Sequence, residues 1–223
     1  MNSAPYGADS RGWLRSLHTR VATLWWLKAL GNTVFLVVFF QLYLWLQKNP
    51  LFAVTQIHAT ALDDWIGFQP WTITLYLSLW VYTALPVALQ PDKPRLMRYA
   101  GTISVLCLVA LLVFLVWPTS VSDAVGVRPA SNGLFAMLYA VDSTGNACPS
   151  LHVAASVMSC MWLQAILTQV RAPAWLNAVN VAWCLGIVFS TLATKQHLLL
   201  DVLAGVALGI GIGWASLRRA KPV

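Results

Sequence analysis

Six long apolar stretches constrain this chain more than any other feature. They cover about residues 25 to 46, 70 to 89, 99 to 117, 151 to 170, 174 to 194 and 197 to 217. Each is close to the roughly 20 residues that a helix needs to cross about 30 Å of hydrocarbon. Hydrophobic residues make up 59% of the chain and charged residues only 9%, far from the balance of a soluble domain. We therefore predict an all-α polytopic membrane protein, a bundle of six transmembrane helices.

The distribution of charge predicts how this bundle is oriented. With six spans both termini lie on one side of the membrane, and that side holds 11 of the 14 lysines and arginines: Arg11, Arg15, Arg20, Lys28, Lys93, Arg95, Arg98, Arg171, Arg218, Arg219 and Lys221. The opposite side keeps only Lys48, Arg128 and Lys195. By the positive-inside rule the termini are cytoplasmic and the other face is periplasmic, as in a bacterial inner-membrane protein.

The same reasoning divides the chain. Residues 1–24 are expected to form a cytoplasmic N-terminal segment, 25–217 the six-helix membrane domain, and 218–223 a basic cytoplasmic tail. A net charge of +7 would suggest a nucleic-acid partner in a soluble protein, but here the basic residues flank apolar spans. We expect no nucleic acid. The four cysteines have no C-x-x-C spacing, so neither a disulfide nor a zinc site is predicted.

Two polar clusters interrupt the apolar pattern at the outer face. CPSLHVA (148–154) opens the fourth span, and STLATKQHLLLDVLAG (190–205) joins the fifth to the sixth. One helical hairpin separates His152 from His197, so both histidines should meet at one depth of the membrane. His197 and Asp201 stand at i and i+4, which on a helix places the carboxylate beside one imidazole nitrogen. The other nitrogen is then free to act as a nucleophile or base.

The residues around the histidines suit a phosphate. Ser150 is a natural N-cap of the fourth helix, whose N-terminus offers unpaired N–H groups to an anion. His152 lies two residues later and can donate a proton to a leaving-group oxygen. Lys195 and Arg128 can supply a cationic clamp for the charged oxygens. This chemistry requires no metal and no cofactor.

These two segments resemble the second and third motifs, PSGH and SRxxxxxHxxxD, of the type 2 phosphatidic acid phosphatase superfamily, which is related to the vanadium haloperoxidases. The membrane branch of that family has six helices and an exoplasmic site. The resemblance implies that His197 is the nucleophile that forms a phosphohistidine and that Asp201 orients it. It also implies that His152 is the general acid and that Ser150 contacts phosphate, with Ser190 at the start of the third motif.

The resemblance is incomplete in its cationic positions. Arg128, followed by Pro129, falls where the first motif, KxxxxxxRP, ends, but the lysine position of that motif is Val121. The glycine of PSGH is Leu151, and the arginine of the third motif is Thr191. The combination of PSLH with KQHxxxD is more similar to the branch that includes the inositol phosphorylceramide and sphingomyelin synthases.

We therefore expect a metal-independent lipid phosphatase or head-group phosphotransferase that acts on a lipid phosphoester in the outer leaflet. The sequence leaves open the lipid, the choice between hydrolysis and transfer, and the oligomeric state. The alternative is a small transporter or scaffold in which His197 and Asp201 relay protons, although a transporter needs polar groups that continue inward along the helices. Asp63 and Asp64 are interpreted as caps of an interfacial turn. Small-residue spacing predicts close helix packing at Gly205, Gly209, Gly211 and Gly213.

Overall fold

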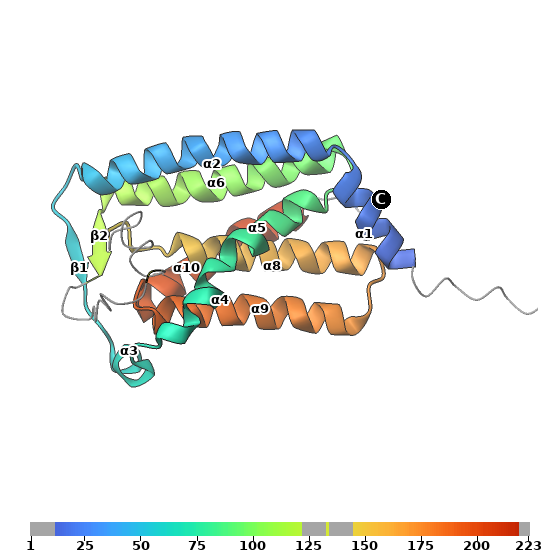
Figure 1. Cartoon of the computed structure of the whole chain (residues 1–223). Helices are drawn as coiled ribbons and strands as arrows, with labels where there is room; N and C mark the ends of the chain where they lie inside the picture. The colour runs from blue at the N-terminus through green and yellow to red at the C-terminus, as the bar shows by residue number, and fades with distance from the viewer. Residues whose placement is uncertain (1–11, 122–132, 134–144, 219–223) are drawn as a thin grey trace, which may run out of the picture.

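The computed structural model confirms the all-α, six-span architecture. It describes residues 12–121, 133 and 145–218, and within these ranges six helical segments are long and apolar enough to cross a membrane. Five are single helices: α2 (Trp25–Lys48), α6 (Lys93–Val116), α8 (Leu151–Gln169), α9 (Ala174–Ala193) and α10 (Leu199–Arg218). Figure 1 shows them running side by side, with α1 (Gly12–Ala22) across one end of the bundle.

The second span is built from three pieces. A 3₁₀ turn, η1 (Pro70–Thr72), leads into α4 (Ile73–Leu77), and α5 (Leu79–Ala88) follows after an interruption at Ser78. The Ser78 hydroxyl donates to the Leu75 carbonyl at 2.6 Å and accepts from Trp183 Nε1 of α9 at 2.8 Å. α4 packs against α9, and Figure 1 shows it beside the end of α9 that lies opposite α1.

Two helices begin away from the approximate starts that were predicted, and at each start a carboxylate accepts from a backbone amide. The third span begins at Lys93 instead of about residue 99, since Asp92 accepts from the Arg95 amide at 2.8 Å and Pro94 suits the first turn. The sixth begins at Leu199 instead of 197. Asp201 Oδ2 accepts from the Leu198 amide at 3.0 Å, which is half of a capping box. His197 therefore precedes the helix.

Helix α8 lies at the centre of the bundle, packed against α5, α9 and α10. Glycines let α10 approach it closely: a Cβ on Gly205 would lie 2.5 Å from the Ser150 carbonyl oxygen, and one on Gly209 would lie 2.6 Å from that of Ala154. Gly213 faces the Met161 side chain in the same way, which confirms the predicted packing for three of the four glycines. Gly211 is the exception, with nothing within 4 Å of its would-be Cβ.

Short elements that the sequence did not predict brace the end of the bundle opposite α1 (Figure 1). β1 (Thr55–Ile57) pairs in parallel with β2 (Thr119–Val121), with Thr55 opposite Thr119. The Thr119 hydroxyl accepts from the Cys148 amide at 2.8 Å and so connects the strands to the segment that precedes α8. α3 (Ala61–Ile66) begins with a capping box between Thr60 and Asp63, as expected for Asp63.

Candidate active site

The structure brings His152 and His197 into direct contact. His152 lies in the first turn of α8, and His197 lies in the turn between α9 and α10. His152 Nδ1 is 3.2 Å from His197 Nε2, and the ring centroids are 5.4 Å apart. The hairpin of α8 and α9 closes the 45-residue separation in sequence. Two nitrogens of neighbouring imidazoles thus share one small site.

The His197 turn is held by backbone contacts on both sides. The His197 amide donates to the Thr191 carbonyl at 3.1 Å. Thr191 stands at the arginine position of the third motif, but it is fully buried and its hydroxyl donates to the Val188 carbonyl at 2.8 Å. Because His197 is outside the helix, its contact with Asp201 comes from this turn and not from the i, i+4 geometry of a helical face.

Asp201 lies behind the nucleophile candidate. Its Oδ2 is 3.6 Å from His197 Nδ1, an ion-pair distance that exceeds a normal hydrogen bond. Asp201 is fully buried, and neither its Oδ1 nor His197 Nδ1 has a hydrogen-bond partner among the described residues. A buried carboxylate next to an imidazole nitrogen favours a proton on that nitrogen. A small movement of the His197 ring toward Asp201 would therefore form a hydrogen bond between His197 Nδ1 and the carboxylate.

Tyr76 of α4 is a fourth member of the site that the sequence analysis missed. Its hydroxyl lies 2.9 Å from His152 Nε2, and its ring packs on the imidazole with centroids 5.0 Å apart. Tyrosines are frequent at the ends of membrane spans, so no local signal singles this one out. Only the packing of the second span in the bundle shows the contact.

One order of protons satisfies all the contacts of the two rings. With a proton on His197 Nδ1 facing Asp201, His197 Nε2 carries the lone pair and accepts from His152 Nδ1–H. The Tyr76 hydroxyl lies at His152 Nε2, where it donates to a neutral ring or accepts from a protonated one. In this order the lone pair that faces the site belongs to His197 and the proton that faces it belongs to His152. A nucleophile needs that lone pair, and a general acid needs that proton on the protonated form of its ring.

Ser150 caps α8, as predicted, with its hydroxyl oxygen accepting from the Val153 amide at 3.3 Å. Its own amide donates to the Asp201 carbonyl at 3.0 Å, so the start of α8 is tied to the first turn of α10. Ser190 is fully buried, and its hydroxyl donates to the Ile187 carbonyl at 2.6 Å within α9.

Lys195 is engaged with the first outer connection. Its Nζ donates to the Asp63 carbonyl oxygen, and the Asp63 carboxylate accepts from the Leu199 amide at 2.9 Å. Burial lowers the pKa of Lys195, and the nearby Asp63 opposes that shift. Asp63 therefore contacts residues on both sides of His197 and positions the turn. Arg128, the other predicted cationic ligand, lies outside the described residues.

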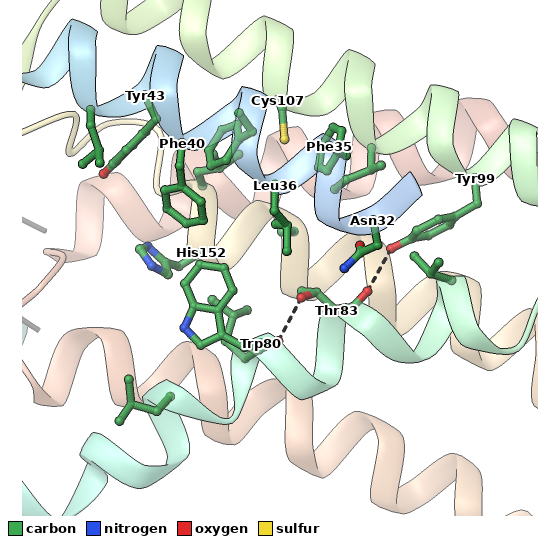
Figure 2. A pocket seen from close by; sticks show the side chains of 18 of the residues that line it. Asn32, Phe35, Leu36, Phe40, Tyr43, Trp80, Thr83, Tyr99, Cys107 and His152 are labelled. Atoms are coloured by element: carbon green, nitrogen blue, oxygen red, sulfur yellow. Dashed lines mark hydrogen bonds between the residues drawn. The ribbon is translucent and has the colours of Figure 1, made fainter. Parts of the chain in front are cut away.

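An apolar cavity of about 220 Å³ leads from His152 into the bundle between α2, α4, α5, α6 and α8. Figure 2 shows His152 at one end, near Phe40 and Trp80, and Tyr99, Thr83 and Asn32 at the other. The walls are aromatic and aliphatic, with Phe35, Leu36 and Cys107 among them. The cavity is thus a hydrophobic chamber that ends on the face of one site imidazole.

No group of three or more His, Cys, Asp or Glu side chains gathers as a candidate metal centre in the part of the chain that the structure describes. A family model of the PAP2 superfamily matches residues 16–222, nearly the whole chain. No curated protein and no solved structure matches the chain.

Proposed function

Because the chain belongs to the PAP2 superfamily, we propose that it cleaves or transfers a lipid phosphoester through a phosphohistidine on His197. Members of this superfamily are phosphatases or phosphotransferases, and six apolar helices make this one an integral membrane protein. The observation that carries the proposal is the 3.2 Å contact between His152 Nδ1 and His197 Nε2, with Asp201 behind it.

The proton order in the site supports a two-step reaction. In the first step His197 Nε2 attacks phosphorus and the bond from phosphorus to the leaving oxygen breaks. His152, protonated on both ring nitrogens beside the bound phosphate, gives its Nδ1 proton to that oxygen and becomes a neutral ring. Asp201 stabilises the positive charge that the phosphorylated ring acquires. In the second step His152 takes a proton from water or from a lipid hydroxyl, whose oxygen attacks phosphorus and breaks the P–N bond. The free His197 is then restored.

The resting contact has to open before the first step. In-line attack places the nucleophile about 3 Å from phosphorus, and the acid has to reach the leaving oxygen on the far side of that atom. Both distances cannot fit within the 3.2 Å that now separates the two nitrogens. We propose that the phosphate group displaces the contact between the rings and that the Tyr76 hydroxyl retains His152 while it does so.

The cavity supports a lipid substrate. Its apolar walls suit a hydrocarbon chain, and it ends at His152, where a phosphate has to be placed. For the phosphate oxygens we propose Ser150, the free amides at the start of α8, and Arg128 as ligands. Lys195 and Ser190 join them only if their hydrogen bonds to the Asp63 and Ile187 carbonyls are exchanged for phosphate.

The charge distribution supports an exoplasmic site. The end of the bundle that carries α1 also carries most of the described basic residues, whereas the histidine end holds Lys48 and Lys195. By the positive-inside rule we propose that the α1 end is cytoplasmic and that the histidines face the periplasm of a bacterial inner membrane, with the substrate in the outer leaflet.

The function is tested with purified protein in detergent and in nanodiscs. It is incubated with lipid phosphates, lipid diphosphates and glycerol phosphate, each with and without acceptor lipids that carry a free hydroxyl. We expect turnover of the lipid phosphates and much less of glycerol phosphate, which has no tail for the cavity. Phosphate release without an acceptor identifies a hydrolase, and new phospholipid identifies a transferase. No turnover of any lipid phosphoester would contradict the proposal.

Tyr76→Phe tests the role of the tyrosine hydroxyl. Loss of the phenol removes the hydrogen-bond partner of His152 Nε2, and one positioning hydrogen bond is worth about 1 kcal/mol. We expect kcat to fall about fivefold with KM little changed, a greater loss for substrates with poor leaving groups, and an altered limb of the pH profile.

The matched control is Tyr82→Phe, another buried tyrosine of the same span, whose hydroxyl bonds to Asn180 Oδ1 at 2.7 Å. We expect this variant to lose stability without any dependence on the leaving group. If Tyr76→Phe behaves in the same way as Tyr82→Phe, Tyr76 has only a packing role.

A further inference from the structure

A second cluster of charge lies at the α1 end of the bundle, remote from the histidines. Arg20 of α1 donates from Nη2 to Gln169 Oε1 at the end of α8, at 2.9 Å. Lys28 of α2 donates to the carbonyl oxygens of Arg20 at 2.6 Å and Ala88 at 2.8 Å. Both cations are almost fully buried, with 9% of Arg20 and 6% of Lys28 exposed.

The Arg20 guanidinium is incompletely paired. Its Nη1 is buried and has no hydrogen-bond partner within the described ranges. Burial lowers the pKa of Arg20, and the charge of Arg95 lowers it further. A buried donor of a charged group costs free energy when it has no hydrogen-bond acceptor, and a second cation nearby increases that cost.

The carboxylate near this cluster is already engaged. Asp92 Oδ1 accepts from the Arg95 amide as the cap of α6, and Asp92 Oδ2 lies 3.6 Å from Arg95 Nε. The Lys28 ammonium donates to carbonyl oxygens at helix ends. These hydrogen bonds give Nη1 of Arg20 no acceptor. Arg20 and Arg95 thus share one carboxylate, with Lys28 next to Arg20, and the site has the charge and the free donor to take an anion.

The surroundings of the cluster place it at the level of lipid head groups. Trp25 and Trp26, at the start of α2, are 67% and 56% exposed, as expected of aromatic residues in a membrane interface. Leu14 and Val21 of α1 are also about half exposed, so α1 presents apolar side chains to its surroundings. These exposed aromatic and apolar side chains favour a phospholipid head group as the anion for this cluster.

We propose that Arg20 and Arg95 hold the phosphate of an anionic phospholipid from the leaflet at the α1 end, and that this lipid is a structural ligand separate from the substrate. Basic pockets between transmembrane helices are known to take such head groups. The planar guanidinium of Arg20 can form paired hydrogen bonds to phosphate oxygens. A bound head group would connect α1 to α6 and α8 and compensate the like charges.

The test measures thermal unfolding and lipid binding by native mass spectrometry, using the full chain in delipidated detergent solution. Phosphatidylglycerol, phosphatidylcholine and inorganic phosphate are added separately. We expect phosphatidylglycerol to raise the unfolding temperature and to remain bound as one adduct, and phosphatidylcholine to do neither. Arg20→Gln should weaken phosphatidylglycerol binding about tenfold or more, as expected for loss of a charge-assisted pair.

Arg98→Gln is the matched control, because it removes the same charge from an exposed position of α6 at the same end. It should leave the adduct and the temperature shift unchanged. If Arg20→Gln does not fold, Arg95→Gln takes its place with the same expected loss. The proposal is overturned if Arg20→Gln or Arg95→Gln binds as the parent does, if Arg98→Gln weakens binding equally, or if inorganic phosphate alone reproduces the full stabilisation.

Discussion

His197→Ala is expected to abolish turnover of every lipid phosphoester that the parent protein accepts. Without His197 Nε2 the phosphohistidine on this residue cannot form, and water would have to attack the lipid phosphoester directly. The expected loss is several orders of magnitude in kcat, because removal of a nucleophile eliminates a covalent step. It is measured as release of phosphate or transfer to an acceptor, together with trapping of the labelled phosphoenzyme under alkaline quench, where a phosphohistidine survives.

The fold should survive this change. The His197 side chain contacts Asp201 and His152, whereas the turn is held by the His197 amide and by the Asp63 contacts with Lys195 and Leu199. The unfolding temperature and the elution volume in size-exclusion chromatography show whether the His197→Ala variant is folded. His58→Ala is the control, since His58 is exposed beside β1 and should retain full activity. Normal turnover by His197→Ala would refute the proposed mechanism.

Gly205→Ala is expected to have the largest effect on stability. The added Cβ would lie 2.5 Å from the Ser150 carbonyl oxygen and 3.1 Å from Val153 Cβ. Both neighbours belong to the start of α8, where a backbone oxygen cannot rotate away. Overpacking of this kind costs about 1–3 kcal/mol. Because Ser150 and His152 move with the same turn, we expect activity to fall as well.

Gly211→Ala supplies the comparison on the same helix. Gly211 is exposed and nothing lies within 4 Å of its would-be Cβ. Alanine there should leave stability unchanged or raise it slightly, since glycine costs a helix interior up to about 1 kcal/mol. Unfolding in a denaturing detergent titration measures both variants. Equal stability of Gly205→Ala and Gly211→Ala would mean that α8 and α10 separate without cost.

The membrane architecture was predictable because it depends on local quantities. Span length, hydropathy and the alternation of basic and neutral ends are properties of single segments. The errors occurred at ends decided by individual side chains. Asp92 and Asp201 begin α6 and α10 by accepting from backbone amides, and a hydropathy pattern does not record a cap.

The site was predictable only in part, and the division follows the range of the interactions. His152 and His197 could be placed together because one hairpin connects their spans. Tyr76 could not, because 76 residues separate it from His152 and its approach depends on how the second span packs in the bundle. The contact of Lys195 with Asp63 spans 132 residues and gives this lysine a structural partner that its position in the motif does not suggest.

The amino-acid sequence alone thus determined that the chain spans the membrane six times, that its polar chemistry lies at one end, and that two histidines and an aspartate belong to that chemistry. Hydrophobicity and short spacings suffice for these conclusions, since each acts over a few helical turns. Only the tertiary structure decided which nitrogen faces which group, which cation is already bound, and where an apolar cavity meets the site. Those properties depend on packing between distant segments, where a shift of one turn changes every partner.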